Sequence, residues 1–181
     1  EVSLVVSDGE SEVSAESVEV VVLNALPTVT EVLVEPTEAY ETSVLTASAT
    51  TADADGDAVS VAWAWSVNGT VVTDATSNTL DGASFSKHDS VVATVTPSDE
   101  EEAGAALDSS AVAILNSAPS MTSVSLEPAD IYEASTVTCT PTGWADVDDD
   151  TESYLYAWEV NGAGIGETGE TLDGGSFSRS D

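Results

Sequence analysis

The chain has 181 residues and a formal net charge of −32, from 34 acidic residues against two basic ones. Nucleic-acid binding requires Lys and Arg to neutralise phosphates, so this balance excludes nucleic acid as a direct partner and argues against anionic membrane surfaces. Because 41% of the residues are hydrophobic, the chain can form a packed core and is not a disordered acidic tail.

The sequence repeats itself with a period of about 92 residues. Tyr40-Glu41 recurs as Tyr132-Glu133, and residues 79–82 (Thr-Leu-Asp-Gly) recur as residues 171–174. Self-similarity at a fixed period predicts an array of like modules, and such arrays usually bind, span or assemble. We expect three parts: the last two strands of a truncated module (1–24), a complete module (25–116) and a truncated module lacking its last two strands (117–181).

Both ends of the sequence fall within a repeat. Residues 2–23 match 93–115, the end of the complete module, and residues 122–181 match its beginning. Two interpretations remain open. The sequence is a window of a longer polypeptide, or its head and tail meet those of neighbouring copies, as in donor-strand assembly.

Along the chain, short runs rich in Val, Thr and Ala alternate with clusters of Pro, Gly, Asn, Asp and Ser, and no helical period persists. This pattern is typical of an all-β sandwich. In the complete module we expect strands near 29–35, 43–50, 59–67, 70–73, 78–85, 90–96 and 108–115.

The clearest strand is 59–67, and the third module repeats its pattern at 154–160. Large and small side chains alternate there, so the aromatic rings share one face with valines. This favours a core position over the alternative, an exposed aromatic platform for sugars. The alternating residues are Val61, Trp63, Trp65 and Val67 in the complete module and Tyr154, Tyr156, Trp158 and Val160 in the third.

These motifs carry a family resemblance. Residues 52–57 (Ala-Asp-Ala-Asp-Gly-Asp) precede the aromatic strand, which ends in Val67-Asn68-Gly69, and the module closes with residues 93–99 and 116–119. The combination resembles the PKD-type immunoglobulin-like repeat of bacterial surface proteins. The resemblance implies tandem immunoglobulin-like (PKD-like) β-sandwich modules in an extracellular adhesin, spacer or surface fibre. The turn at residues 68–70 departs from the Gly-Asp-Gly typical of PKD modules.

Alternate carboxylates occupy the loop before the aromatic strand in both modules. Such carboxylates can converge on one hard cation, and Ca²⁺ accepts about six to eight oxygens in irregular geometry. The alternative is that Asp and Gly are simply good turn formers. The expected ligands are Asp53, Asp55 and Asp57 in the complete module and Asp146, Asp148 and Asp150 in the third.

Further acids are expected at the junctions between modules. In such a sandwich the loop holding Asp99 shares one end with residues 53–57, and the linker at residues 24–27 enters there. The opposite end of each module carries Glu41 or its counterpart Glu133, which are weaker ligand candidates. Calcium there would stiffen the array, as a loose similarity to cadherin-like repeats implies. The alternative is a solvated acidic surface in a saline medium.

The two basic residues, Lys87 and Arg179, lie 92 residues apart, at the same position of the repeat. Their turn faces the acidic loops of the next module, so we expect a contact between modules or between filament neighbours. The alternative is a solvated turn residue inherited by duplication.

The only thiol, Cys139, corresponds to Ala47 on the second strand. In the immunoglobulin-like folds that the chain resembles, this strand is bridged to the sixth, where Ala93 is the facing residue. We therefore expect a disulfide partner at the position 92 residues beyond Ala93, which lies after the end of the sequence. The alternative is a buried free thiol that acts as a small hydrophobe.

No catalytic arrangement can be assigned, because a single histidine cannot support a recurring Ser-His-acid triad and no zinc-type spacing occurs. We expect a non-enzymatic structural module of a large extracellular, secreted or cell-surface protein, forming a calcium-stiffened fibre, filament or stalk. Its partners would be neighbouring modules or copies of itself. The alternatives are an adhesin for a cell-surface glycan or protein, and the spacer of a secreted enzyme.

Overall fold

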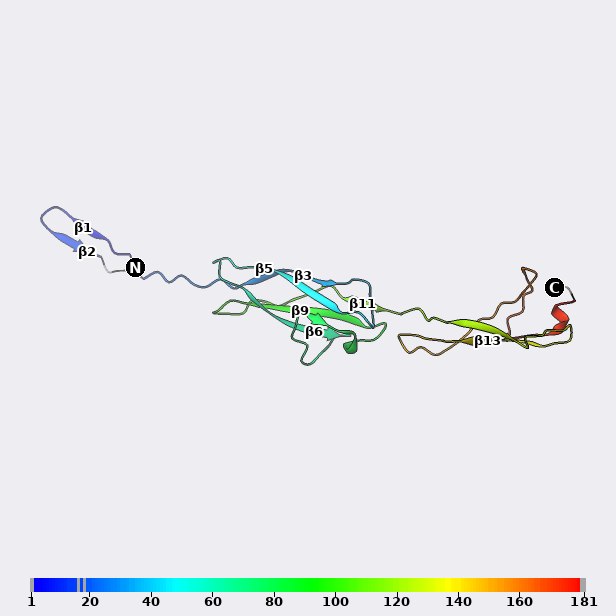
Figure 1. Ribbon diagram of the computed structural model, residues 1–181. Helices are drawn as coiled ribbons and strands as arrows, with labels where there is room; N and C mark the ends of the chain where they lie inside the picture. Colours follow the sequence, from blue (N-terminus) through cyan, green and yellow to red (C-terminus); the bar gives the residue numbers. More distant parts are fainter. Residues whose placement is uncertain (1, 16, 18, 180–181) are drawn as a thin grey trace.

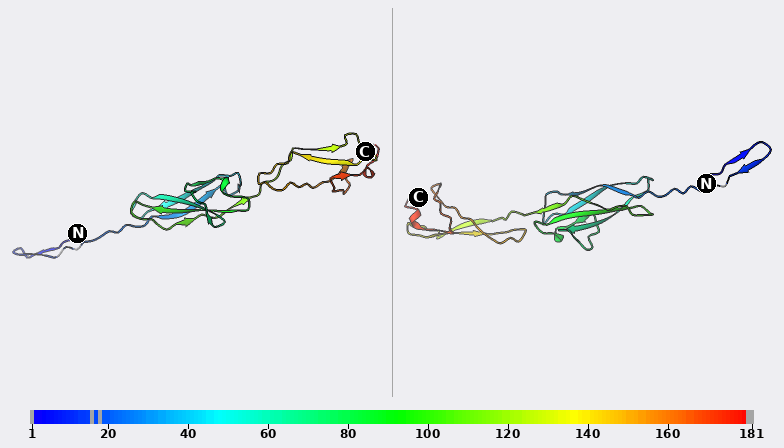
Figure 2. Two further views of the ribbon diagram at one scale, coloured as in Figure 1. Left: turned by 90° about the horizontal axis from the view of Figure 1, so that it is seen from below. Right: turned by 180° about the vertical axis from the view of Figure 1, so that it is seen from behind.

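The computed structural model describes residues 2–15, 17 and 19–179, and it is all-β, as the sequence predicts. An N-terminal hairpin, a central unit (residues 28–115) and a C-terminal unit (residues 123–179) follow one another along an extended chain (Figures 1 and 2). In the described residues, no helix is long and apolar enough to cross a membrane.

Most strands are short. They are β1 (Val5–Ser7), β2 (Glu12–Ser14), β3 (Thr28–Glu35), β4 (Ala39–Tyr40), β5 (Leu45–Ala52), β6 (Ser60–Val67), β7 (Thr70–Val71), β8 (Thr79–Leu80), β9 (Ser90–Ser98), β10 (Leu107–Asp108), β11 (Val112–Leu115), β12 (Ser123–Glu127), β13 (Val137–Thr142), β14 (Glu159–Val160), β15 (Ala163–Gly164) and β16 (Thr171–Leu172), with single 3₁₀ turns η1 (Gly82–Ser84) and η2 (Gly174–Ser176).

The central unit contains two sheets that share one core. One sheet has the order β3-β5-β8, and the other has the order β4-β11-β9-β6-β7, with β10 also paired to β9. All these pairs are antiparallel except β4 with β11, which is parallel. Side chains from both sheets meet in the core, including Val32 and Leu45 from the first and Val91, Val95 and Ile114 from the second. This arrangement is consistent with a β-sandwich.

The aromatic strand β6 places its large side chains as expected. Trp65 is only 1% exposed, and its indole Nε1 donates a hydrogen bond to the carbonyl oxygen of Ser77 at 2.9 Å. Trp63 packs half-buried against the same core, whereas Ala62 and Ala64 are exposed. The rings therefore belong to the core and do not form a platform for sugars.

A two-residue turn joins β6 to β7. Asn68 and Gly69 have φ values of 51° and 78°, the left-handed conformation that a type I′ hairpin turn requires at both positions. Asn161 and Gly162 repeat it between β14 and β15, with φ values of 51° and 75°.

The strand predicted at 78–85 is shorter than expected. Only Thr79–Leu80 pairs as β8, and the chain then turns through η1. The Asp81 side chain accepts a hydrogen bond from the N–H of Ala83 at 3.1 Å, which favours the turn over continued pairing.

In the C-terminal unit, β12, β13 and β16 form one sheet and β14 and β15 form a separate hairpin. The strand expected at 154–160 is paired only at Glu159–Val160. In the central unit its counterpart β6 pairs with β9, and the counterpart of β9 falls after residue 181. Among the described residues, 154–160 therefore has no counterpart of β9 to pair with, although half-buried and exposed side chains still alternate along it.

The N-terminal hairpin pairs β1 with β2, and the described residues 2–15 are all exposed. Its turn uses Asp8, whose Oδ1 accepts hydrogen bonds from the N–H groups of Glu10 and Ser11 at 2.9 and 2.7 Å. Asp99 builds the same turn after β9, accepting from Glu101 and Glu102 at 2.8 and 2.7 Å.

Candidate metal centre at the junctions

Two groups of three aspartates form the candidate sites. The first triad is Asp53, Asp55 and Asp57, between β5 and β6, and the second triad is Asp146, Asp148 and Asp150, after β13. In each triad, every residue offers one carboxylate oxygen within 4.8 Å of the others, so either group could hold a metal ion.

The first aspartate of each triad organises its loop. Asp53 Oδ1 accepts hydrogen bonds from the N–H groups of residues 55, 56 and 57 at 2.8, 3.0 and 3.2 Å. Asp146 Oδ1 accepts from Asp148 and Asp150 at 2.9 and 3.1 Å. The Oδ1 atom of the first aspartate thus fixes the shape of the loop, and its Oδ2 atom takes no part in these hydrogen bonds.

The remaining oxygens are the chemically informative ones. Asp53 Oδ2, Asp146 Oδ2 and Asp148 Oδ1 are buried and accept no hydrogen bond from the described residues. Asp148 as a whole is only 9% exposed. A buried charged oxygen without a donor is unfavourable, and a bound cation would compensate it.

Each triad is also tied to the linker that leads into it. The N–H of Ala25 donates to Asp55 Oδ2 at 2.6 Å, and the N–H of Ser117, 92 residues later, donates to Asp148 Oδ2. Sequence analysis identified the linkers but not these donors, because a backbone amide leaves no side-chain signature. The only sequence signal for these contacts was the recurrence of the linker motif itself, at residues 24–27 and 116–119.

Asp99 lies at the same end as the first triad but outside it. Asn24 donates its Nδ2 hydrogen to Asp99 Oδ2 at 3.1 Å, next to the Ala25 contact with Asp55. The N–H of Glu102, the Asn24 amide and the N–H of Glu101 together lower the pKa of Asp99 below its usual value of 3.8.

Glu41 and Glu133 are not members of either triad. Glu41 Oε1 accepts the backbone N–H of Lys87 at 2.8 Å, and Glu133 Oε1 accepts that of Arg179 at 2.6 Å. Both carboxylates therefore stabilise a turn, the one before β9 in the central unit and the equivalent turn in the C-terminal unit. This role explains their recurrence without a metal.

Lys87 reaches across the junction. Its ammonium Nζ forms an ion pair with Asp150 Oδ1 of the second triad. For Arg179, the described contact is the one made by its backbone.

Cys139 lies on β13 opposite Leu126 and has no disulfide partner among the described residues. Its N–H donates to the carbonyl of Glu170 at 2.9 Å, as that of Ala47 does to Asn78 at 2.7 Å. Ala47 and Ala93 are both buried in the central core. The disulfide stays a prediction, because its expected partner position lies outside the sequence.

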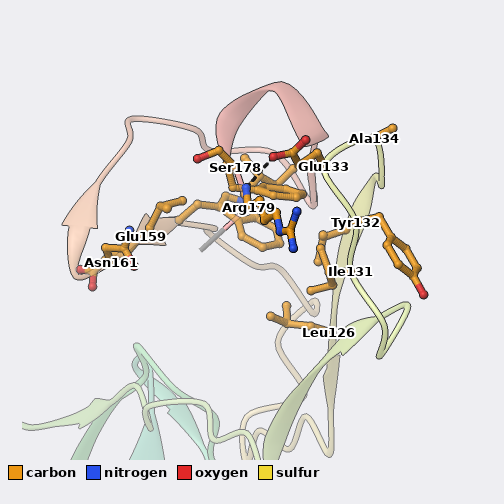
Figure 3. Close-up of a pocket in the computed structure, with 14 residues that line it drawn as sticks. Leu126, Ile131, Tyr132, Glu133, Ala134, Glu159, Asn161, Ser178 and Arg179 are labelled. Carbon is orange, nitrogen blue, oxygen red and sulfur yellow. Dashed lines mark hydrogen bonds between the residues drawn. The ribbon is translucent and has the colours of Figure 1, made fainter. Parts of the chain in front are cut away.

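An apolar cavity of about 780 Å³ opens in the C-terminal unit (Figure 3). Its lining includes Leu126, Val137, Trp158, Leu172 and Phe177. The counterparts of these residues in the central unit are buried in the core that β9 and β11 help to form. They are Val34, Leu45, Trp65, Leu80 and Phe85. The cavity is therefore the uncovered side of a core, and the Glu133 carboxylate at its rim accepts the backbone N–H of Arg179.

No protein-family model, curated protein or solved structure matches this chain.

Proposed function

We propose that the chain is a structural segment of an extracellular array of immunoglobulin-like, PKD-like modules, in which Ca²⁺ at the module junctions stiffens a fibre, filament or stalk. The observation that carries this proposal is the junction itself. The two linker amides, 92 residues apart, are each bonded to the middle aspartate of a triad. Each triad contains at least one buried carboxylate oxygen that has no donor among the described residues.

The donor set favours a hard cation. Each triad supplies only carboxylate oxygens, in a loop whose shape is already fixed by hydrogen bonds from backbone N–H groups to its first aspartate. Ca²⁺ accepts such oxygens in irregular geometry, and carbonyl groups and water would complete its shell. An ion bound to Asp55 or Asp148 would hold the linker amide and the loop together, which would restrict bending at the junction.

The sheet order supports the immunoglobulin-like part of the proposal. The β3-β5-β8 sheet faces a sheet in which β9 lies between β6 and β11, with a buried Trp on β6. Two facing antiparallel sheets around such a Trp are features of the immunoglobulin sandwich.

Neighbouring modules or copies of the chain are the proposed partners. The exposed Val20 and Val22 correspond to Val112 and Ile114, which are buried in the central unit. A segment of this kind would cover the cavity of the C-terminal unit, whether it belongs to the same polypeptide or to another copy.

Calcium titration of the chain by calorimetry tests the proposal. We expect saturable binding to the chain, and we expect Asp148→Asn to remove one site because it removes a buried ligand charge. Asp149→Asn is the matched control, since Asp149 lies in the same loop with φ 54° but outside the triad. Absence of binding at millimolar calcium would contradict the metal assignment.

A further inference from the structure

A tethered cation distinguishes the second triad from the first. Lys87 of the central unit places its ammonium group on Asp150 of the second triad. Among the described residues, no ion pair reaches the first triad, and the other base, Arg179, belongs to the C-terminal unit.

Lys87 is held in position from its own side of the junction. Its backbone N–H donates to Glu41 Oε1 at 2.8 Å, and its side chain is only 20% exposed. The ammonium group therefore reaches Asp150 from a fixed turn, and the contact links two elements that are 63 residues apart.

The ammonium compensates the second triad incompletely. One positive charge faces three carboxylates, and Asp146 Oδ2 and Asp148 Oδ1 still accept no hydrogen bond from the part of the chain that the structure describes. Asp148 is 9% exposed, so water compensates it poorly. These two oxygens remain as ligands for a second cation, which would also draw on Asp150.

We propose that the Lys87 ammonium and a divalent cation are alternative occupants of Asp150, so that Lys87 acts as a built-in competitor at the second triad. This inference rests on the proposed function, because it requires the triads to bind metal. A divalent ion and an ammonium group repel each other at one carboxylate, so metal binding releases Lys87. The second triad then binds the ion more weakly than an otherwise equal site without Lys87.

The competition has a consequence for the junction. When divalent cations are scarce, the ammonium group holds the turn at residue 87 against the loop of the C-terminal unit. When they are abundant, the ion replaces the ammonium group on Asp150, while the Ser117 amide stays bonded to Asp148, as it is when Lys87 is paired. The ion pair across the junction is then lost, and Lys87 becomes accessible to solvent.

Calorimetric titration of the chain with CaCl₂ tests the competition with three proteins: the unmodified chain, Lys87→Met and Arg179→Met. We expect Lys87→Met to tighten binding at one site by roughly two- to fivefold, the weight of a partly exposed ion pair. Arg179→Met removes the same charge at the equivalent repeat position, so it controls for the change in net charge. It should leave the ratio of the two affinities unchanged.

A second readout observes Lys87 directly. Lys87 is the only lysine, since two basic residues are present and the other is Arg179. Selective ¹⁵N-lysine labelling therefore gives one Nζ signal. We expect this signal to move during the calcium titration and to follow occupancy of the weaker site, and we expect acetylation of Lys87 to become faster with calcium.

The outcomes separate the two proposals. Calcium binding to both triads with no gain from Lys87→Met, or an unmoved Nζ signal at saturation, would overturn the competition and leave the metal sites standing. Weaker binding in Lys87→Met would overturn it as well, since Lys87 would then support the site. If none of the three proteins bound calcium, both proposals would fail.

Discussion

At the scale of single residues, the first aspartate of each triad has two separate tasks. One oxygen of Asp53 or Asp146 accepts backbone N–H groups and shapes the loop, and the other is buried without a donor. Turn formation alone requires only the first oxygen. The second distinguishes a turn aspartate from a ligand candidate, and this distinction is invisible in the sequence.

Gly82 provides a prediction at this scale. A Cβ atom there would lie 1.7 Å from the carbonyl oxygen of Glu41, and the equivalent Gly174 meets Glu133 in the same way at 2.1 Å. We expect Gly82→Ala to lower the free energy of unfolding of the central unit by about 1–3 kcal/mol, because the backbone must shift. Urea unfolding followed by tryptophan fluorescence measures this. Gly175→Ala, which points into open space, is the control and should be nearly neutral.

Asp99 provides a prediction for pH. Its pKa is lowered in the folded chain by the N–H of Glu102 and by the Asn24 amide. The stabilisation is therefore present above about pH 3.8, the ordinary value, and is lost as the pH falls through the lower folded-state value. We expect Asp99→Ala to lower the Tm at pH 7, and the difference from the unmodified chain to shrink below pH 3.8. Glu100→Ala is the control. A Tm difference that stayed constant with pH would argue against this role of the carboxylate.

At the scale of elements, one sequence pattern leads to two outcomes. β6 and residues 154–160 carry the same alternation, yet only β6 forms a full strand, because β9 pairs with it from Ser60 to Val67. Alternation therefore predicted which face would be apolar in both places. It could not predict pairing, which depends on a strand supplied from elsewhere in the chain.

Trp65 and Trp158 allow this difference to be measured. Both indoles donate to a backbone carbonyl, at 2.9 Å to Ser77 and 2.8 Å to Gly169, but Trp65 is buried and Trp158 is half-buried. We expect Trp65→Phe to cost about 2–4 kcal/mol, from lost volume and an unsatisfied carbonyl. Trp158→Phe should cost clearly less in the same denaturation experiment. Equal effects would mean that the C-terminal unit is as well packed as the central unit.

Much of the fold followed from pattern, and the candidate site followed in part. The spacing of Val, Trp and turn residues predicted β3, β6 and β9 to within about two residues. The alternation of Asp residues predicted both triads. It did not separate them from Glu41 and Glu133, whose carboxylates bond to backbone amides. Backbone donors and the burial of individual oxygens arise only when distant segments meet.

At the scale of the whole molecule, acidic charge is distributed along an extended chain whose units are joined by two linkers. We expect calcium to narrow the range of end-to-end distances, because ions at the triads would join linker and loop and reduce repulsion. Small-angle X-ray scattering with and without chelator measures this. Magnesium at equal ionic strength is the control, and an equal effect of both ions would indicate screening alone.

The parallel pairing of β4 with β11 has a mechanical consequence. Ile114 and Leu115 lie beside Ala39 and Tyr40 in the same direction. A pull on the two ends of the central unit would therefore drag these strands past each other. Their hydrogen bonds would bear the load together, in shear, instead of opening one after another. A chain under tension would then be held by this short bridge, at Ala39–Tyr40 and Ile114–Leu115, together with the β3–β5 ladder that precedes it in the chain.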